Sequence, residues 1–289
     1  MKSINFKKDK IFIFSLITLI LLATFFRLNN LNYDDLWTDE IFSFWVSDPT
    51  ISFNETLLRA FSSGLNFFFD LGLKFFHLAF GYDVHISRHF SFSIGVISFL
   101  IFTFLVLKIT SHKSVIFGIY ILCINLYHIK YSQELRSYIL TFLFTLIFIL
   151  LNFKGRDSIN KFNFYRFFLS LIVIFMMYCN HAFTILVVAS FIVFKFFEIV
   201  KEKKISKYNI LLILSYILTT LIFLVFYYYT NLKFINPESL NSLSPHWLKQ
   251  PKLSFYTNFY FSEFFGSRIL GLIHWLILIF CIIKFRTLF

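Results

Sequence analysis

The chain of 289 residues is 58% hydrophobic and only 15% charged, whereas soluble domains carry about 25% charged residues. Apolar runs of roughly 20 residues are typical of transmembrane helices. The composition therefore argues against a soluble fold and predicts an all-α, polytopic transmembrane helical bundle. The net charge of +12 comes from Lys and Arg concentrated in short loops between apolar runs. This pattern predicts contact with membrane lipids and no nucleic-acid partner.

The apolar segments lie, in chain order, at approximately 11–26, 65–80, 89–107, 115–127, 137–153, 167–197, 210–229 and 269–283. Lysines precede the first segment and no small-residue cleavage pattern follows it, so we expect an uncleaved membrane anchor. Segment 65–80 contains polar side chains and either crosses the membrane or lies along its interface. Segment 167–197 is too long for one ordinary crossing, and Tyr178-Cys179-Asn180-His181 interrupts it.

The distribution of Lys and Arg discriminates between two arrangements. If 65–80 lies along the membrane and 167–197 folds as two short helices with an outer tip, most basic residues fall inside. If both segments cross once, the basic residues divide almost evenly, which agrees poorly with the positive-inside rule. We therefore expect about eight crossings and a cytoplasmic N-terminus, with outer loops 27–88 and 230–268. The whole chain, 1–289, would be a single domain of a bacterial inner membrane.

This topology gathers polar segments that are distant in sequence. Residues 27–64, 81–88, 128–136 and the tip around His181 would meet on the outer face, where the first loop is expected to contain interfacial helices. Ionisable residues at such a boundary are candidates for function. The sequence therefore predicts a reaction or binding site there.

Carboxylates are most concentrated directly after the first apolar segment. Those in this stretch are Asp34, Asp35, Asp39, Glu40, Asp48 and Glu55. Adjacent acids on a helix point about 100° apart, so one of Asp39 and Glu40 can face a substrate while the other binds a cation. A helix cap or two solvated acids is the commoner reading of such a pair. Trp37, just before it, is typical of an interfacial anchor.

Two further polar positions lie beside apolar segments. Arg88 stands at the mouth of segment 89–107, where it either snorkels to lipid headgroups or provides a fixed cation for phosphate. His181 interrupts 167–197. It either is satisfied by packing, or binds a phosphate as imidazolium or a metal as neutral imidazole.

The island 127–138 is dense in polar groups between two apolar runs. On a continuous helix, Glu134 and Tyr138 would share a face, while Arg136 would point about 160° away from Tyr138. An ordinary charged turn is the alternative reading. The length and mixture of side chains favour a functional role.

Taken in order, these residues resemble the motifs of the C-type superfamily of integral-membrane glycosyltransferases, within the family of protein O-mannosyltransferases and lipid A aminoarabinose transferases. The resemblance covers about residues 11–270. In that family an arginine ends the first helix, a W-x-D-E motif follows, an arginine opens a later helix, and YSQEAR-x-Y and Y-x-H motifs come next. The matching stretches here are Arg27, Trp37-Thr38-Asp39-Glu40, Ser87-Arg88-His89-Phe90-Ser91 with Gly95, Tyr131-Ser132-Gln133-Glu134-Leu135-Arg136-Ser137-Tyr138, and Tyr178-Cys179-Asn180-His181, which has one extra residue.

The resemblance implies an enzyme that moves a sugar from a polyprenyl-phosphate donor to a hydroxyl or amine of a lipid, glycan or protein acceptor. It implies Asp39 as the catalytic carboxylate, supported by Glu40, Trp37 and Tyr138. Donor-phosphate contacts are expected from Arg88, Glu134, Arg136 and His181. Whether a divalent metal takes part stays open, and Glu40 and His181 are the candidate ligands for one. Phosphate is a good leaving group, so one base with direct attack predicts inversion at the anomeric carbon.

Two features depart from the family. Its members carry HPPL or NPPL before the second apolar segment, whereas residues 62–68 contain no proline. They also usually continue with several more helices, so we expect a reduced or partial form. Two other functions remain open. A flippase for lipid-linked sugars would need polar groups deep within several helices, and a non-catalytic membrane subunit would tolerate loss of Asp39.

Overall fold

The structure, a computed structural model, describes residues 10–62, 66–109, 112–152, 164–202 and 207–234, with isolated positions between 269 and 279. The described residues up to 234 belong to one compact unit, Met1–Ile235. In the second unit, Asn236–Phe289, the few described positions are helical. The predicted outer loop 230–268 lies almost entirely outside the described residues, and the single domain over 1–289 stays a prediction.

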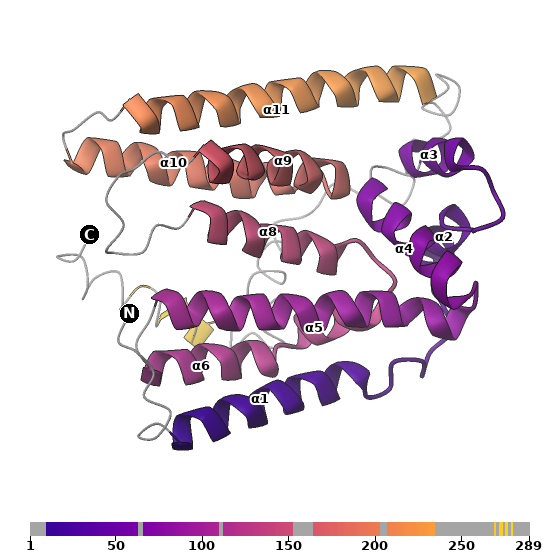
Figure 1. Ribbon diagram of the computed structural model, residues 1–289, viewed down its shortest axis with the longest axis horizontal. Coiled ribbons are helices and arrows are strands. Elements are labelled where there is room, and N and C mark those ends of the chain that lie inside the picture. The colour runs from indigo at the N-terminus through magenta and orange to yellow at the C-terminus, as the bar shows by residue number, and fades with distance from the viewer. Residues whose placement is uncertain are drawn as a thin grey trace. The chain divides into compact units, whose positions relative to one another are not determined.

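Every regular element in the described ranges is a helix, which confirms the predicted all-α class. In chain order they are α1 (Lys10–Leu28), α2 (Thr38–Val46), α3 (Phe53–Ser62), α4 (Phe67–Phe80), α5 (Val84–Ile109), α6 (His112–Cys123), α7 (Leu126–Gln133), α8 (Tyr138–Asn152), α9 (Phe164–Asn180), α10 (Thr184–Glu202) and α11 (Lys207–Phe234). The long helices run side by side in both directions (Figure 1).

Three helices of the described chain are long and apolar enough to cross a membrane: Lys10–Leu28, Val84–Ile109 and Asn209–Tyr229 within α11. A fourth span is formed if α6 and α7, which bend by 49° at their junction, are taken together. Helices α1 and α11 leave most of their apolar side chains exposed, which suits contact with lipid. These helices are compatible with an integral membrane protein.

The predicted division of segment 167–197 into two helices is confirmed. Helix α9 ends at Asn180 and α10 begins at Thr184. Figure 1 shows the two helices returning on one another, with their connection near the end of the bundle that holds α3 and α4. The polar break therefore has a structural cause, because the chain reverses direction there.

Helices α2, α3 and α4 gather at one end of the unit, where α1 ends and α5 begins (Figure 1). At 14 residues, α4 spans about 21 Å, less than the roughly 30 Å of a bilayer core. This agrees with the expectation that segment 65–80 does not cross. Its buried face, with Phe69 and Leu73, packs into the main apolar core together with α8, α9 and α11.

The bend between α6 and α7 is stabilised by the buried side chain of Arg27 at the end of α1. Its Nη2 donates to the carbonyl of Leu122 at 3.0 Å, and its Nη1 donates to that of Cys123 at 3.4 Å. The last carbonyls of a helix have no partner within the helix. Arg27 supplies such a partner to two carbonyls at this break.

Candidate functional site

A buried ion pair lies at the centre of the polar end of the bundle. Glu40, in the first turn of α2, and Arg88, in the first turn of α5, bond through two parallel contacts. Arg88 Nε lies 3.0 Å from Glu40 Oε1 and Arg88 Nη2 lies 2.8 Å from Glu40 Oε2. The Arg88 side chain is 8% exposed and the Glu40 side chain is 1% exposed. Such a bidentate, desolvated pair fixes both orientation and distance.

Glu40 has no acceptor site left for a ligand. Besides Arg88, its carboxylate accepts from the backbone N–H of Leu135 at 2.7 Å and from that of Trp37 at 3.3 Å. A carboxylate offers about four lone-pair sites. Glu40 therefore caps its own helix and also joins α2, α5 and the α7–α8 connection.

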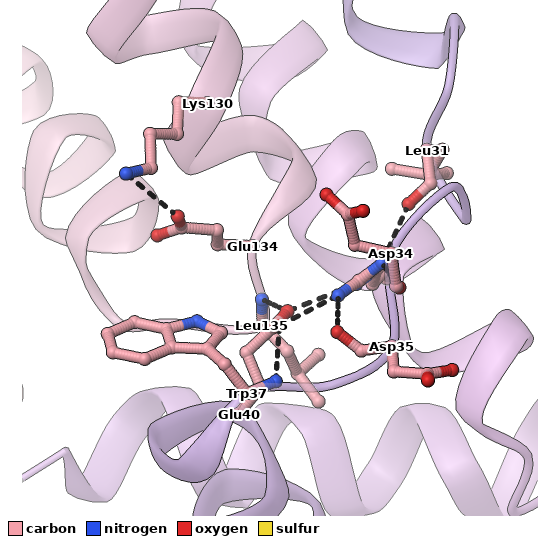
Figure 2. A network of polar contacts seen from close by, with 9 residues as sticks. Leu31, Asp34, Asp35, Trp37, Glu40, Lys130, Glu134 and Leu135 are labelled. Atoms are coloured by element: carbon pink, nitrogen blue, oxygen red, sulfur yellow. Dashed lines mark hydrogen bonds and ion pairs between the residues drawn. The ribbon is translucent and has the colours of Figure 1, made fainter.

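Arg88 is equally committed. Its remaining N–H groups donate to the backbone carbonyls of Leu31 at 3.2 Å, Asp34 at 2.6 Å and Asp35 at 3.1 Å. All five donors of a guanidinium are thus taken by protein acceptors. Asp34 and Asp35 turn their carboxylates away from these contacts (Figure 2). This geometry favours a positioning role for Arg88 over the phosphate contact predicted from the sequence.

Asp39 lies on the other side of α2 and faces a different partner. Its carboxylate forms an ion pair with Arg136 and is 46% exposed, whereas the Arg136 side chain is 16% exposed. The adjacent acids Asp39 and Glu40 therefore pair with different arginines; that one of them faces a substrate stays a prediction. The buried acid holds the helix, and the half-exposed acid remains accessible to a substrate.

Aromatic rings surround Arg136. Its guanidinium carbon lies 5.2 Å from the centre of the Trp37 ring and 5.1 Å from that of Tyr138, within the range of cation–π attraction. Its Nη2 donates to the Tyr138 hydroxyl at 3.1 Å, and the Tyr138 ring lies 5.2 Å from that of His181. The structure thus brings together residues from the first loop, the 127–138 island and the α9–α10 tip.

Of the two readings that the sequence left open, residues 134–137 form a bend between two helices and not a continuous helix. Helix α7 ends at Gln133 and α8 begins at Tyr138, and Glu134 has extended backbone angles (φ −86°, ψ 141°). Because the chain bends there, Arg136 and Tyr138 meet instead of pointing apart. The bend also presents the Leu135 N–H to Glu40, so the buried ion pair stabilises it.

The surroundings of His181 disfavour its charged form. Burial, and then the charge of Arg136, lower its pKa below the ordinary value. This favours a hydrogen-bonding imidazole over the imidazolium that the sequence left open. Glu134 differs, since burial raises the pKa of its carboxyl and the nearby Lys130 opposes part of that effect.

A cavity of about 430 Å³ opens beside the Glu40–Arg88 pair. Its wall includes the Trp37 indole and the Lys130–Glu134 ion pair, whose Nζ and Oε1 are 3.4 Å apart. Figure 2 shows this pair and the indole on one side of Glu40 and the two aspartates on the other. The volume suits a small headgroup, and the charged side chains in the lining favour a polar one.

The metal site predicted from Glu40 and His181 does not fit the donors present. Both oxygens of Glu40 accept from protein N–H groups. In the described ranges, no group of three His, Cys, Asp or Glu side chains is arranged to hold a metal ion. We therefore derive no step through a metal.

Two polar arrangements were not predicted from the sequence. His128 Nδ1 accepts from Arg27 Nε at 3.0 Å, and its Nε2 lies 3.0 Å from Ser98 Oγ, deep among the helices. Asn180 accepts from the Phe69 N–H at 3.1 Å and donates to the Ser137 carbonyl at 3.0 Å. Through these two bonds, Asn180 ties α4 to the end of α9 and to Ser137, the residue after Arg136.

Comparisons with known proteins identify no relative. No protein-family profile, curated protein or solved structure matches this chain.

Proposed function

We propose that the chain is a membrane glycosyltransferase that moves a sugar from a polyprenyl-phosphate donor to a hydroxyl or amine acceptor. The observation that carries the proposal is that two neighbouring acids on α2 have different partners and different exposure. A buried Glu40–Arg88 pair fixes the helix, while the neighbouring Asp39 is half-exposed beside Arg136. A fixed scaffold below one accessible carboxylate is what a positioned general base requires.

The proposed setting is the outer face of a bacterial cell membrane. With the N-terminus in the cytoplasm and about eight crossings, the basic loops stay inside. The end of the bundle that holds α2, α3 and α4 then faces outward at the interface. A lipid-linked sugar exposes its anomeric carbon at that level, where nucleotide sugars are absent.

Asp39 would accept the proton of the attacking hydroxyl or amine. Attack on the anomeric carbon forms the new glycosidic bond as the bond to phosphate oxygen breaks, so the configuration inverts. The polyprenyl phosphate leaves with the bonding electron pair and needs no general acid. Arg136 would stabilise the charge on that phosphate, and the neutral His181 would donate a hydrogen bond to it.

The cavity on the Glu40 side of α2 is the proposed binding place for a headgroup, and Trp37, which lines it and also lies against Arg136, would connect it to the Asp39–Arg136 pair. The indole supplies an apolar wall, and Lys130 and Glu134 supply opposite charges at its mouth. This combination suits a polar sugar with one apolar face.

Transfer from a panel of polyprenyl-phosphate sugars tests the proposal. Purified wild-type protein in lipid nanodiscs is mixed with each donor and with candidate acceptors, and products are detected by mass spectrometry. We expect one donor to yield a glycosylated product of inverted anomeric configuration. Equal yields from wild-type protein and Asp39→Asn would instead support a non-catalytic subunit.

A further inference from the structure

A second carboxyl lies beneath the Asp39–Arg136 pair. Asp70, in the first turn of α4, is 1% exposed. The Ser43 hydroxyl lies close enough to lower its pKa, but neither of its oxygens accepts a well-aligned hydrogen bond from any group that the structure describes, and the buried Nε of Arg136 likewise has no acceptor there. Unsatisfied buried polar groups are costly and rare in native proteins. Two of them as neighbours, one acceptor and one donor, point to a contact made in another state.

Three hydrogen bonds hold Asp70 near Arg136. Ser137 Oγ, next to Arg136, donates to Asn66 Oδ1 at 2.7 Å. The Phe69 N–H, next to Asp70, donates to Asn180 Oδ1 at 3.1 Å, and Asn180 Nδ2 donates back to the Ser137 carbonyl at 3.0 Å. The first turn of α4 is therefore fixed against the 134–137 bend on both sides.

The environment disfavours the charged form of Asp70. Burial raises the pKa of its carboxyl well above the ordinary value, and the Ser43 hydroxyl and the Arg136 charge oppose only part of that effect. A neutral carboxyl still has a carbonyl oxygen that accepts hydrogen bonds. A guanidinium N–H donated to it makes a charge-assisted bond without any proton transfer.

We propose that Asp70 is a positioning residue: it is the inner acceptor that receives Arg136 when Arg136 releases Asp39. This inference rests on the proposed function, because the Asp39 carboxylate must leave its ion pair with Arg136 to contact an acceptor hydroxyl or amine. A released and largely buried guanidinium needs another acceptor. Asp70, which is buried and lies within the electrostatic reach of Arg136, provides one, and the unpaired Nε–H of Arg136 is the donor that would meet it.

A double-mutant cycle on protein stability tests this without any activity. The melting temperature in detergent is measured for wild type, Asp39→Ala, Asp70→Leu and the double variant. We expect Asp70→Leu alone to melt near wild type, since Arg136 keeps Asp39. The double variant should lose clearly more than the sum of the two single losses, because Arg136 then has neither carboxyl. Additive losses would overturn the proposal.

Two further variants sharpen the cycle. Asp39→Ala/Asp70→Asn keeps a carbonyl acceptor and should melt near Asp39→Ala alone. Asp48→Ala is the matched control, since Asp48 bonds to Thr50 away from Arg136; combined with Asp70→Leu it should be additive. If Asp39→Ala/Asp70→Leu fails to fold while Asp39→Ala/Asp70→Asn folds, the result supports the proposal in the same way as a large non-additive loss.

Sugar transfer gives the second readout. Asp70→Leu should lower kcat by about tenfold or more, the effect of one charge-assisted hydrogen bond, with KM for the donor unchanged. A purely structural role would instead lower the amount of folded protein at constant kcat. If wild type transfers no sugar, the proposed function fails, but the stability cycle still decides the role of Asp70. If the enzyme is active and the stability losses are additive, the proposed role of Asp70 is overturned while the proposed function stands.

Discussion

Removal of Glu40 should be among the most destabilising single changes in the polar end of the bundle. Glu40→Ala leaves the Arg88 guanidinium, 8% exposed, without its carboxylate. It also leaves the N–H groups of Leu135 and Trp37 without their acceptor. Breaking a buried pair from one side costs about 3–5 kcal/mol, and an orphaned buried N–H adds about 1–3 kcal/mol. Relaxation and water entry offset part of this, so we expect a loss of about 4 kcal/mol.

The chain offers a matched control for this variant. Glu55 also pairs with an arginine, Arg59, at 2.8 Å, but its side chain is 44% exposed. An exposed pair of this kind contributes about 0–1 kcal/mol, so Glu55→Ala should be nearly silent.

Unfolding of both variants by SDS in mixed micelles, followed by circular dichroism, gives the two losses directly. Glu40→Leu/Arg88→Met, which removes both charges, should recover part of the stability lost in Glu40→Ala. The reasoning is refuted if Glu40→Ala loses no more than Glu55→Ala.

Three further predictions concern packing, pH and the link between α4 and α9. Gly95→Ala would place its Cβ 2.2 Å from Ser132 Oγ and should lower stability by about 1–3 kcal/mol. In Gly118→Ala the new Cβ would lie 3.5 Å from its nearest neighbour, so this variant should not lose stability. Melting curves of the two variants decide this, and equal losses would contradict the prediction. Since burial raises the pKa of Asp70 in the folded protein, wild type should lose stability as pH rises from about 4, the unfolded value, through the folded one. Asp70→Asn lacks this loss, so its melting temperature relative to wild type should increase with pH; a constant difference would show that Asp70 is not the titrating group. Asn180→Ala removes the acceptor of the Phe69 N–H and the donor to the Ser137 carbonyl. It should lower the free energy of unfolding by about 2–3 kcal/mol and speed hydrogen exchange at the Phe69 amide. Unchanged exchange at that amide would refute the link between α4 and α9.

The fold class could be predicted because apolar periodicity and charge act locally. The break at His181 and the short helix over 65–80 were both visible in the sequence, since a polar interruption and a limited length each decide an element by themselves. The bend over 134–137 was not visible in the sequence. It is stabilised from outside, by Glu40 accepting the Leu135 N–H, and a partner 95 residues away leaves no local signal.

The candidate site could be predicted as a set of residues but not as a set of contacts. Asp39, Arg136, Tyr138 and His181 do lie together. The pairing of Glu40 with Arg88, which engages all the donors of that arginine, follows from three-dimensional packing alone. Asp70 carried one signal, an acid inside an apolar segment, although nothing in the sequence indicated that it would lie beneath Arg136.

The central claim is that Asp39 is the base of a sugar transfer, and the rate of transfer by Asp39→Asn tests it most directly. The variant keeps the size of the side chain and a contact to Arg136, and circular dichroism confirms that it is folded. Asp48→Asn is the matched control. The account predicts that Asp39→Asn lowers kcat by about 10²–10⁴-fold, the usual contribution of a general base, while Asp48→Asn stays near wild type. A folded Asp39→Asn that transfers sugar at the wild-type rate would contradict it.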